Sequence, residues 1–375
     1  MPAHLHSGLP FRVVYLLCAW GSLLGAGCGQ RTSTRAPVAA PLPVRVLNWD
    51  DYIDPAVLTN FTLRTGIPVE YNTYSTQDEL TGAVRSDPGR YDLIVVDDSV
   101  IEMLQELRLL RPMEPERIKG LENLGTRWRR HPTDPDSRYS IPYLWGTTLL
   151  AYRKDRLTEP PTDWSVLWDA RYRGRIMMLA DFQENIGLAL LSLGNSINSG
   201  VATQLSRAQE RLCRQASLVQ SYASGTDIKQ ALLSGSTWVA PLYSGDAAMA
   251  AEASDQVDYV LPTGGAPIWI DRFAMPRDSR NPDGARAFIE YLLIPEIAAQ
   301  NAEYLCYATP NEAALPLLSK ELLADTRLFP PREVLDRCEF YSKPDAARLR
   351  IYNTTAAEVR RLTKNPPEAG PPAMP

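Results

Sequence analysis

Carboxylates and aromatic rings recur together where β-strands are expected to end. They occur as Trp49-Asp50-Asp51-Tyr52, Asp97-Asp98, Asp181-x-x-Glu184, Tyr243-x-x-Asp246 and Trp269-x-Asp271. Carboxylates accept charge-assisted hydrogen bonds from ammonium groups, and ring faces attract cations and cover methylene groups. The combination therefore predicts a binding site for an elongated organic cation. A sugar site also uses aromatic rings, but it would not need so many carboxylates.

Catalysis has few candidate residues. Of the three histidines, His131 is the one outside the first ten residues, and it lies in His-Pro-Thr-Asp-Pro, a sequence typical of a surface loop. Ser-His-Asp or Cys-His chemistry would depend on this residue alone. The chain carries no His/Cys cluster with zinc spacing, no P-loop and no Gly-x-Gly-x-x-Gly motif, so we expect no metal and no cofactor. A glycosidase-like acid pair of Asp181 and Glu184 is the enzymatic alternative.

The first thirty residues have the features of a bacterial export signal. Arg12 is followed by an uncharged run from Val13 to Leu24 and then by Gly25-Ala26-Gly27-Cys28. Small residues before a Cys resemble the lipobox of bacterial lipoproteins. We therefore predict that residues 1–27 are a signal peptide and that Cys28 is lipidated and anchors the protein to a membrane of the cell envelope. An ordinary signal peptide with another cleavage site is the alternative.

The length and composition favour two folded domains. The chain has 375 residues, of which 45% are hydrophobic and 22% charged. Residues 28–43 are rich in Thr, Ala and Pro and are predicted to be a flexible tether, and residues 363–375 a disordered tail. The leader contains one Arg and no acid, so the mature chain has 38 Lys and Arg against 44 Asp and Glu, a net charge of −6. A mildly acidic protein is a poor partner for nucleic acid.

Hydrophobic patterning alternates between strands and helices, which predicts an α/β fold. Asp54 is expected to cap a helix that begins at Pro55 and ends at Gly66. Strands are predicted at 44–49, 67–74, 91–96, 175–180, 238–242, 259–261 and 268–275, and helices at 100–107, 186–193 and 282–293. The units after 139–148 look like a second lobe, so a ligand is expected in the cleft between lobes, at the carboxyl ends of strands.

Several motifs stand in a specific order along the chain. They are Asn48-Trp49-x-x-Tyr52, Tyr91-Asp92-Leu93, Tyr139-Ser140-Ile141-Pro142-Tyr143-x-Trp145-Gly146, Gly264-Gly265 through Trp269-x-Asp271, and Tyr307-x-Thr309-Pro310-Asn311. From about Val44 to about Tyr352 the chain resembles the periplasmic spermidine- and putrescine-binding proteins of ABC transporters.

The resemblance implies a two-lobed periplasmic binding protein fold of type II, each lobe a central mixed β-sheet flanked by helices. Lobe 1 would contain residues 44–146 and 270–315, and lobe 2 residues 147–269 and 316–362. It also implies a monomer that holds putrescine or spermidine between the lobes, delivers it to the permease subunits of the importer, and catalyses no reaction. Ferric iron, thiamine or an aminophosphonate as ligand, or a role in sensing polyamines, are the alternatives within this class.

The resemblance also assigns the site residues. Trp49, Tyr52, Tyr243, Trp269, Tyr307 and Tyr341 would form an aromatic cage, and Asp181, Glu184 and Asp271 would accept hydrogen bonds from nitrogens. Tyr243 replaces the usual Trp, and Tyr341 replaces an amide side chain of the spermidine branch. Asp246 would reach a terminal amine, which favours putrescine.

Some of these residues have structural alternatives. Asp97 and Asp98 would either contact a second ammonium or cap the next helix, and Asp51 would either act through water or close its loop. Asp181 with Glu184 also matches a helix-capping pattern. We interpret Trp145 as a core residue. Cys306 and Cys338 precede two of the site tyrosines and are hypothesised to form a disulfide, with a buried free thiol as the alternative.

Overall fold

The computed structural model of the protein describes residues 41–364. The predicted signal peptide, the lipidation site Cys28 and most of the predicted tether and tail lie outside the described residues. None of the helices within 41–364 is long and apolar enough to cross a membrane.

The described residues form one connected mixed sheet of ten strands in the order β2-β1-β3-β9-β4-β7-β5-β6, with β10 beside β9 and β8 beside β4. The strands are β1 (Val44–Trp49), β2 (Val69–Tyr74), β3 (Leu93–Asp97), β4 (Ser140–Arg153), β5 (Ile176–Leu179), β6 (Val219–Ala223), β7 (Val239–Tyr243), β8 (Val257–Val260), β9 (Pro267–Ala274) and β10 (Glu339–Phe340).

Thirteen α-helices accompany this sheet within residues 41–364. They are α1 (Pro55–Thr65), α2 (Gln77–Ser86), α3 (Asp98–Glu106), α4 (Thr126–Arg129), α5 (Phe182–Leu191), α6 (Ala202–Gln215), α7 (Gly225–Ser234), α8 (Ser244–Ala253), α9 (Pro282–Leu292), α10 (Pro295–Leu305), α11 (Lys320–Ala324), α12 (Arg332–Leu335) and α13 (Ala346–Lys364). Short 3-10 turns span Pro115–Arg117, Leu121–Asn123, Trp164–Trp168, Ala170–Tyr172 and Glu312–Leu317. The predicted α/β fold class is confirmed.

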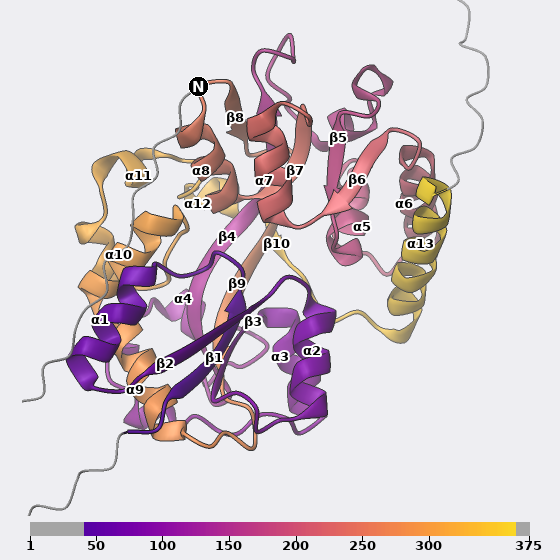
Figure 1. The fold of residues 1–375 in the computed structure, drawn as a ribbon. Coiled ribbons are helices and arrows are strands. Elements are labelled where there is room, and N and C mark those ends of the chain that lie inside the picture. The colour runs from indigo at the N-terminus through magenta and orange to yellow at the C-terminus, as the bar shows by residue number, and fades with distance from the viewer. Residues whose placement is uncertain (1–40, 365–375) are drawn as a thin grey trace, which may run out of the picture. The chain divides into compact units, whose positions relative to one another are not determined.

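Strand β4 joins the two halves of the sheet. Its first half pairs antiparallel with β9, and its second half pairs antiparallel with β7 and β8. All its residues are buried, and β4 and β9 run side by side through the sheet (Figure 1). We call β1, β2, β3, β9 and β10 the first half-sheet and β5 to β8 the second half-sheet. The predicted lobe boundaries at 146/147 and 269/270 fall inside β4 and β9, so they remain a prediction about where the protein bends.

Local sequence explains where the first helix begins and ends. Asp54 Oδ1 accepts a hydrogen bond from Ala56 N at 2.8 Å, Pro55 occupies the first helical position, and Gly66 ends α1 with φ of 74°. The left-handed conformation suits glycine because it has no Cβ. The predicted cap, start and stop of this helix are confirmed.

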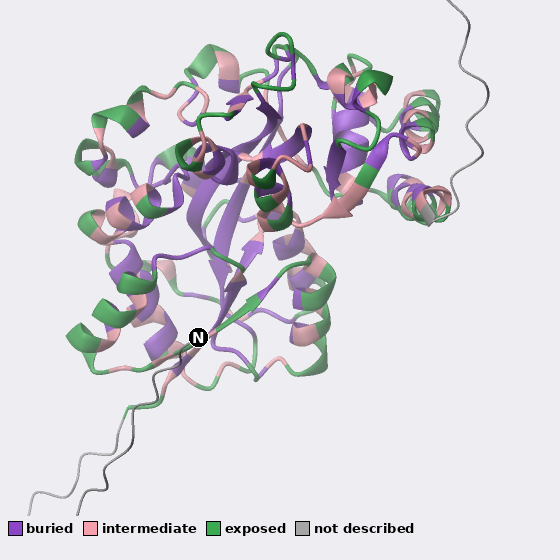
Figure 2. Ribbon diagram, turned by 45° about the horizontal axis from the view of Figure 1, so that its top comes forward, coloured by how far each residue is buried: buried purple, intermediate pink, exposed green. Residues whose placement is uncertain are grey.

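The core lies on both faces of the sheet. Strands are buried almost throughout, whereas the helices expose the faces turned away from them (Figure 2). The C-terminal helix α13 packs beside α6 and α5 (Figure 1). Trp145 is a core residue, as interpreted from the sequence, and stacks on Trp128 with ring centroids 4.4 Å apart.

Two sequence-based expectations about this core are wrong. His131 is 6% exposed and buried rather than on a surface loop, because its Nδ1 lies 3.0 Å from Asp98 Oδ1. Cys306 and Cys338 are free thiols and form no disulfide. The Cys306 thiol lies 3.7 Å from Glu252 Oε1, and that of Cys338 lies 3.5 Å from the carbonyl oxygen of Val334.

Candidate functional site

Strand ends bring polar and aromatic residues to one region. β1 and β3 are parallel neighbours, and so are β5 and β7, so their carboxyl ends lie at a common edge within each half-sheet. The residues at or just after these ends are Trp49, Asp97, Asp181 and Tyr243. Strand pairing adds Asp271, opposite Asp97 between β3 and β9, and Thr148, opposite Tyr243 between β4 and β7.

Asp271 is a buried carboxylate on β9. Its Oδ1 accepts a hydrogen bond from Trp49 Nε1 at 3.1 Å. Burial and the charge of Asp97 raise the pKa of Asp271 to about 7, while Tyr52 and Trp49 act in the opposite direction. A cation bound beside this group would favour its ionised form, because opposite charges stabilise each other most where water is excluded.

Three further carboxylates lie near Asp271. Burial, reinforced by neighbouring carboxylates, raises the pKa of Asp97 to about 6 and that of Glu184 to about 8. Burial also raises the pKa of Asp181. Burial is the largest cause that raises the pKa of the Tyr243 hydroxyl, and the charges of Glu184, Asp181, Asp97 and Asp271 raise it further, so all four lie within electrostatic range of this tyrosine. We call Asp97, Asp181, Glu184 and Asp271 the acidic cluster.

Two members of the acidic cluster also cap helices. Asp97 Oδ1 accepts from Ser99 N at 2.8 Å at the start of α3. Asp181 Oδ1 accepts from Gln183 N at 2.8 Å and from Glu184 N at 3.2 Å at the start of α5. Asp181 therefore caps α5, but within residues 41–364 the Glu184 side chain makes no return hydrogen bond to Asp181, so only the first half of the capping pattern is present. The Asp181 carboxylate still belongs to the acidic cluster. Capping fixes these side chains in place before any ligand arrives.

A row of aromatic rings adjoins the acidic cluster. Ring centroids are 5.3 Å apart for Tyr52 and Tyr307, 5.3 Å for Tyr307 and Trp269, and 5.8 Å for Trp269 and Tyr243, each pair meeting edge to face. We call these four residues the aromatic row. It links the loop after β1 to the end of β7, so it connects the two half-sheets.

Several buried polar atoms in this region have no hydrogen-bond partner within residues 41–364. They are the Tyr52 hydroxyl, Trp269 Nε1, Glu184 Oε1 and Thr148 Oγ1. The Tyr52 hydroxyl nevertheless lies close enough to Asp271, and the Thr148 hydroxyl close enough to Glu184, to lower the pKa of these carboxylates. Buried polar groups in folded proteins are nearly always hydrogen-bonded, so Trp269 Nε1 is the group that most clearly needs a ligand or water as its partner. The described residues contain no group of His, Cys, Asp and Glu arranged to hold a metal ion.

The other residues expected at the site are placed differently. Asp51 is exposed and its φ is 52°. Asp98 is engaged by His131 and by the Thr133 hydroxyl, whose Oγ1 donates to Asp98 Oδ2 at 3.2 Å. Asp246 Oδ1 is paired with Lys229 Nζ at 2.8 Å. The structure therefore does not bring Asp51 and Asp98 into the acidic cluster, and it places a cation on Asp246.

Tyr341 reaches the site from the segment after β10. Its hydroxyl lies 3.5 Å from the carbonyl oxygen of Glu184. Burial is the largest cause that raises the pKa of the Tyr341 hydroxyl, and the charges of Glu184 and Asp181 raise it further. A Cβ at Gly187 on α5 would lie 2.3 Å from this hydroxyl. The absence of a side chain at Gly187 is therefore what makes room for Tyr341.

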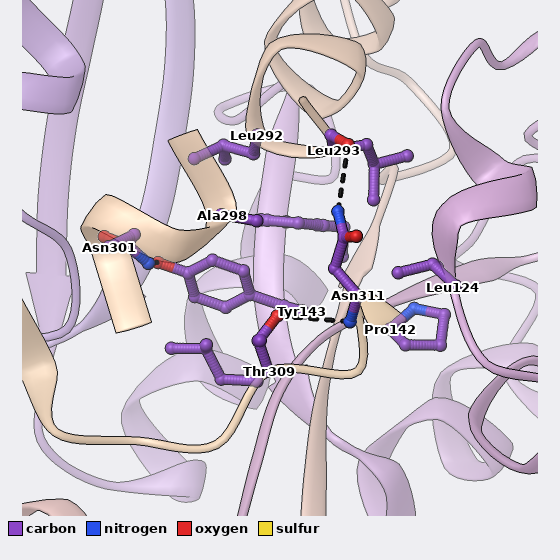
Figure 3. A pocket seen from close by; sticks show the side chains of 11 residues that line it. Leu124, Pro142, Tyr143, Leu292, Leu293, Ala298, Asn301, Thr309 and Asn311 are labelled. Atoms are coloured by element: carbon purple, nitrogen blue, oxygen red, sulfur yellow. Dashed lines mark hydrogen bonds between the residues drawn. The ribbon is translucent and has the colours of Figure 1, made fainter. Parts of the chain in front are cut away.

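A hydrogen-bond network holds the loop that carries Tyr52. The carbonyl oxygen of Tyr52 accepts from Tyr143 OH at 2.9 Å and from Asn48 Nδ2 at 3.2 Å, and Tyr143 OH accepts from Asn301 Nδ2 at 2.9 Å. A small cavity beside Tyr143 and Asn301 has room for about one water molecule (Figure 3). This cavity is too small for an organic ligand and belongs to the support of the site.

Sequence reasoning missed part of this arrangement. Thr148 stands on β4 two residues after Gly146, the last residue of the Tyr139–Gly146 motif. Residues two apart on a strand face the same side, so this spacing pointed to Thr148. Tyr143 and Asn301 were not assigned roles, although Tyr143 lies in the same motif. Lys229 gave no signal, because a single Lys in a helix is an ordinary surface residue.

Comparison with known proteins identifies the family. The profile of bacterial extracellular solute-binding proteins matches residues 56–330. The chain belongs to this family. The spermidine/putrescine-binding periplasmic protein of Escherichia coli is 30% identical to this solute-binding protein over 302 residues, which are 80% of this chain and 86% of that protein.

Two further proteins support the family assignment. The putrescine/cadaverine-binding protein of Pseudomonas aeruginosa is 30% identical over 350 residues, or 90% of this chain and 97% of that protein. Among solved structures, a putative spermidine/putrescine ABC transporter protein from Listeria monocytogenes has a TM-score of 0.80 and 32% identity, covering 85% of this chain and 98% of that one. The solute-binding protein thus has the predicted periplasmic binding protein fold. Because the family consists of binding proteins of transport systems, the chain is not an enzyme.

The contact between Gly187 and Tyr341 gives a first testable prediction. Replacing Gly187 with Ala in the solute-binding protein is expected to displace the Tyr341 hydroxyl and weaken ligand binding about fivefold, the loss of one modest contact of about 1 kcal/mol. Calorimetric titration with putrescine measures the effect. The matched control is Gly82→Ala on α2, where a Cβ meets nothing within 4 Å. Equal affinities of the two variants would contradict a role for Tyr341 in the site.

Proposed function

We propose that the chain is the extracytoplasmic solute-binding component of an ABC-type polyamine importer. It binds putrescine or spermidine between the two half-sheets and delivers it to the permease subunits. One observation supports this most directly. Within residues 41–364, no member of the acidic cluster has a Lys, Arg or His within salt-bridge distance, although Glu184 and Asp271 are buried and Asp97 and Asp181 are half-buried.

The physical argument concerns unbalanced charge. Grouped carboxylates repel one another, and burial disfavours their ionised forms, so the ligand-free site lacks positive charge. A flexible dication supplies it at two points separated by methylene groups. The ammonium ends would meet the acidic cluster, and the methylenes would lie against Trp49 and the aromatic row.

Typical free energies of such contacts are compatible with micromolar affinity for a polyamine. A desolvated cation–π contact contributes about 2 kcal/mol, and a hydrogen bond to a charged group contributes about 1.5 to 3 kcal/mol. Three or four such contacts, reduced by the cost of ordering and desolvating the ligand, are compatible with micromolar binding, which corresponds to about −8 kcal/mol.

The relatives support the same role. They are named as spermidine/putrescine-binding and putrescine/cadaverine-binding proteins, the former periplasmic. We propose that this chain is likewise exported, that Cys28 carries a lipid anchor after residues 1–27 are removed, and that the mature protein is a monomer. We also propose that the two lobes move about β4 and β9 and close on the ligand, which creates the surface that the permease recognises.

Calorimetric titration of residues 29–375 with amines tests the proposal. Putrescine, cadaverine, spermidine and spermine are compared with glutamate and γ-aminobutyrate. We expect micromolar or tighter dissociation constants for at least one polyamine and no heat of binding with the acidic compounds. The midpoint of thermal unfolding should rise as well, because a ligand at 100 times its dissociation constant stabilises the folded state by about 2.7 kcal/mol. A folded protein that binds none of the four amines would refute the proposal.

A further inference from the structure

A buried lysine stands at the edge of the proposed polyamine site. Lys229 on α7 is 8% exposed, and its Nζ lies 2.8 Å from Asp246 Oδ1. The other oxygen, Asp246 Oδ2, accepts a hydrogen bond from the Tyr307 hydroxyl at 3.2 Å. Both oxygens of this carboxylate are therefore engaged by the protein itself, and its charge is balanced by Lys229.

The ion pair of Lys229 and Asp246 adjoins two residues of the aromatic row, Tyr243 and Tyr307. Asp246 lies in the first turn of α8, three residues after Tyr243, which lies within electrostatic range of the acidic cluster. The ring of Tyr307 packs against Tyr52 and Trp269, while its hydroxyl points to Asp246. Tyr307 therefore contacts the ion pair with its hydroxyl and the aromatic row with its ring.

The packing around the pair depends on a glycine. A Cβ at Gly225, the first residue of α7, would lie 2.8 Å from Asp246 Oδ2 and 3.2 Å from the Tyr243 ring. A side chain at this position would push α7, and Lys229 with it, away from Asp246. The close approach of α7 and α8 therefore places the Lys229 ammonium beside the site rather than in solvent.

The chemistry of the pair matches that of a bound polyamine end. A primary ammonium on a methylene chain, hydrogen-bonded to a buried carboxylate whose other oxygen accepts from a tyrosine, is what a terminal amine of the ligand would provide. We propose that Lys229 acts as a built-in ammonium that occupies Asp246 and thereby sets ligand length, so that the site accepts a diamine and disfavours the triamine spermidine. This inference rests on the proposed polyamine function.

The reason lies in the number of available acceptors. The family resemblance assigns a terminal amine to Asp246, but Lys229 holds this carboxylate here. A ligand is therefore left with the acidic cluster, and Asp246 becomes a further acceptor only when Lys229 is removed. A third ammonium that extends toward Asp246 must either displace Lys229 or remain close to a like charge in a region with little water, and both are unfavourable.

Four proteins test the inference: the parent, Lys229→Met, Asp246→Asn, and the double variant Lys229→Met/Asp246→Asn. Each is titrated with putrescine and with spermidine at one pH and ionic strength. For the parent we expect tighter binding of putrescine. Lys229→Met should shift the ratio of the two affinities at least tenfold toward spermidine, because it frees the Asp246 carboxylate. The double variant removes both charges and should return the ratio to within threefold of the parent.

The single variant Asp246→Asn gives an independent result. It leaves the Lys229 charge unpaired beside the site and should weaken binding of both amines at least tenfold, with spermidine weakened at least as much as putrescine. Circular dichroism and the unfolding midpoint without ligand report whether each variant is folded. If Lys229→Met does not fold, Asp246→Asn and the double variant still decide the question.

The outcomes separate this inference from the proposed function. A folded Lys229→Met variant with the parent's ratio overturns the inference, and so does an Asp246→Asn variant with unchanged affinities, while polyamine binding itself would stand. A parent protein that prefers spermidine also overturns it. A parent that binds no amine refutes the proposed function, and the inference fails with it.

Discussion

Replacing Asp271 with Asn is expected to weaken putrescine binding by about 30-fold to 3000-fold, because removing one partner of a buried, hydrogen-bonded charge pair costs about 2 to 5 kcal/mol. Asp271 is buried, stands opposite Asp97 in the sheet and accepts from Trp49 Nε1. Asn keeps the size of the side chain and an oxygen that can accept from Trp49. The expected loss therefore reports the missing negative charge, and calorimetry or competition with a tight ligand measures it.

A matched control and a stability measurement complete this experiment. Asp283→Asn makes the same substitution on α9, where the side chain is 81% exposed and pairs with Arg286, and it should leave putrescine affinity within twofold of the parent. The ligand-free Asp271→Asn protein should unfold at a higher temperature than the parent at pH 8, because it no longer has to ionise a buried carboxylate. Unchanged putrescine affinity would contradict the role assigned to Asp271.

Local chemistry made much of the fold predictable. The cap at Asp54, the proline after it and the glycine at the end of α1 act within a few residues, so they could be identified in the sequence. Two carboxylates of the acidic cluster were also visible locally, because Asp97 ends the buried strand β3 and Asp181 follows the buried strand β5. Asp271 lies within β9 and was assigned from the family resemblance through the Trp269-x-Asp271 motif.

The remaining features depend on contacts between distant segments. Asp97 and Asp98 are adjacent and look equivalent, yet Asp97 enters the acidic cluster while Asp98 turns to His131, 33 positions further along the chain. The same contact explains why a His in a proline-rich stretch is buried. Lys229 meets Asp246 only because α7 and α8 approach closely, and no local pattern in the sequence encodes that approach.

Lowering the pH from 8 to 5.5 is expected to weaken putrescine binding by at least about 30-fold, because a carboxylate with a pKa near 7 is ionised in only about one molecule in thirty at pH 5.5. The ligand-free protein holds the pKa of Asp271 at about 7, that of Glu184 at about 8 and that of Asp97 at about 6. A bound dication requires these groups to be ionised, so binding near pH 7 should release protons. Titrations in two buffers of different ionisation enthalpy count them.

The stability of the ligand-free protein should change with pH in the opposite direction. For Asp271, Glu184 and Asp97 the folded-state pKa lies above the unfolded value of about 4, so between about pH 4 and pH 8 the folded state binds more protons than the unfolded state. The contribution of these groups to the free energy of unfolding therefore decreases as pH rises through this window and is fully lost above their folded pKa values. Saturating putrescine should remove this decrease, because it stabilises the ionised forms. An affinity that stays constant from pH 5.5 to 8, with no proton release, would show that the acidic cluster does not contact the ligand's ammonium groups.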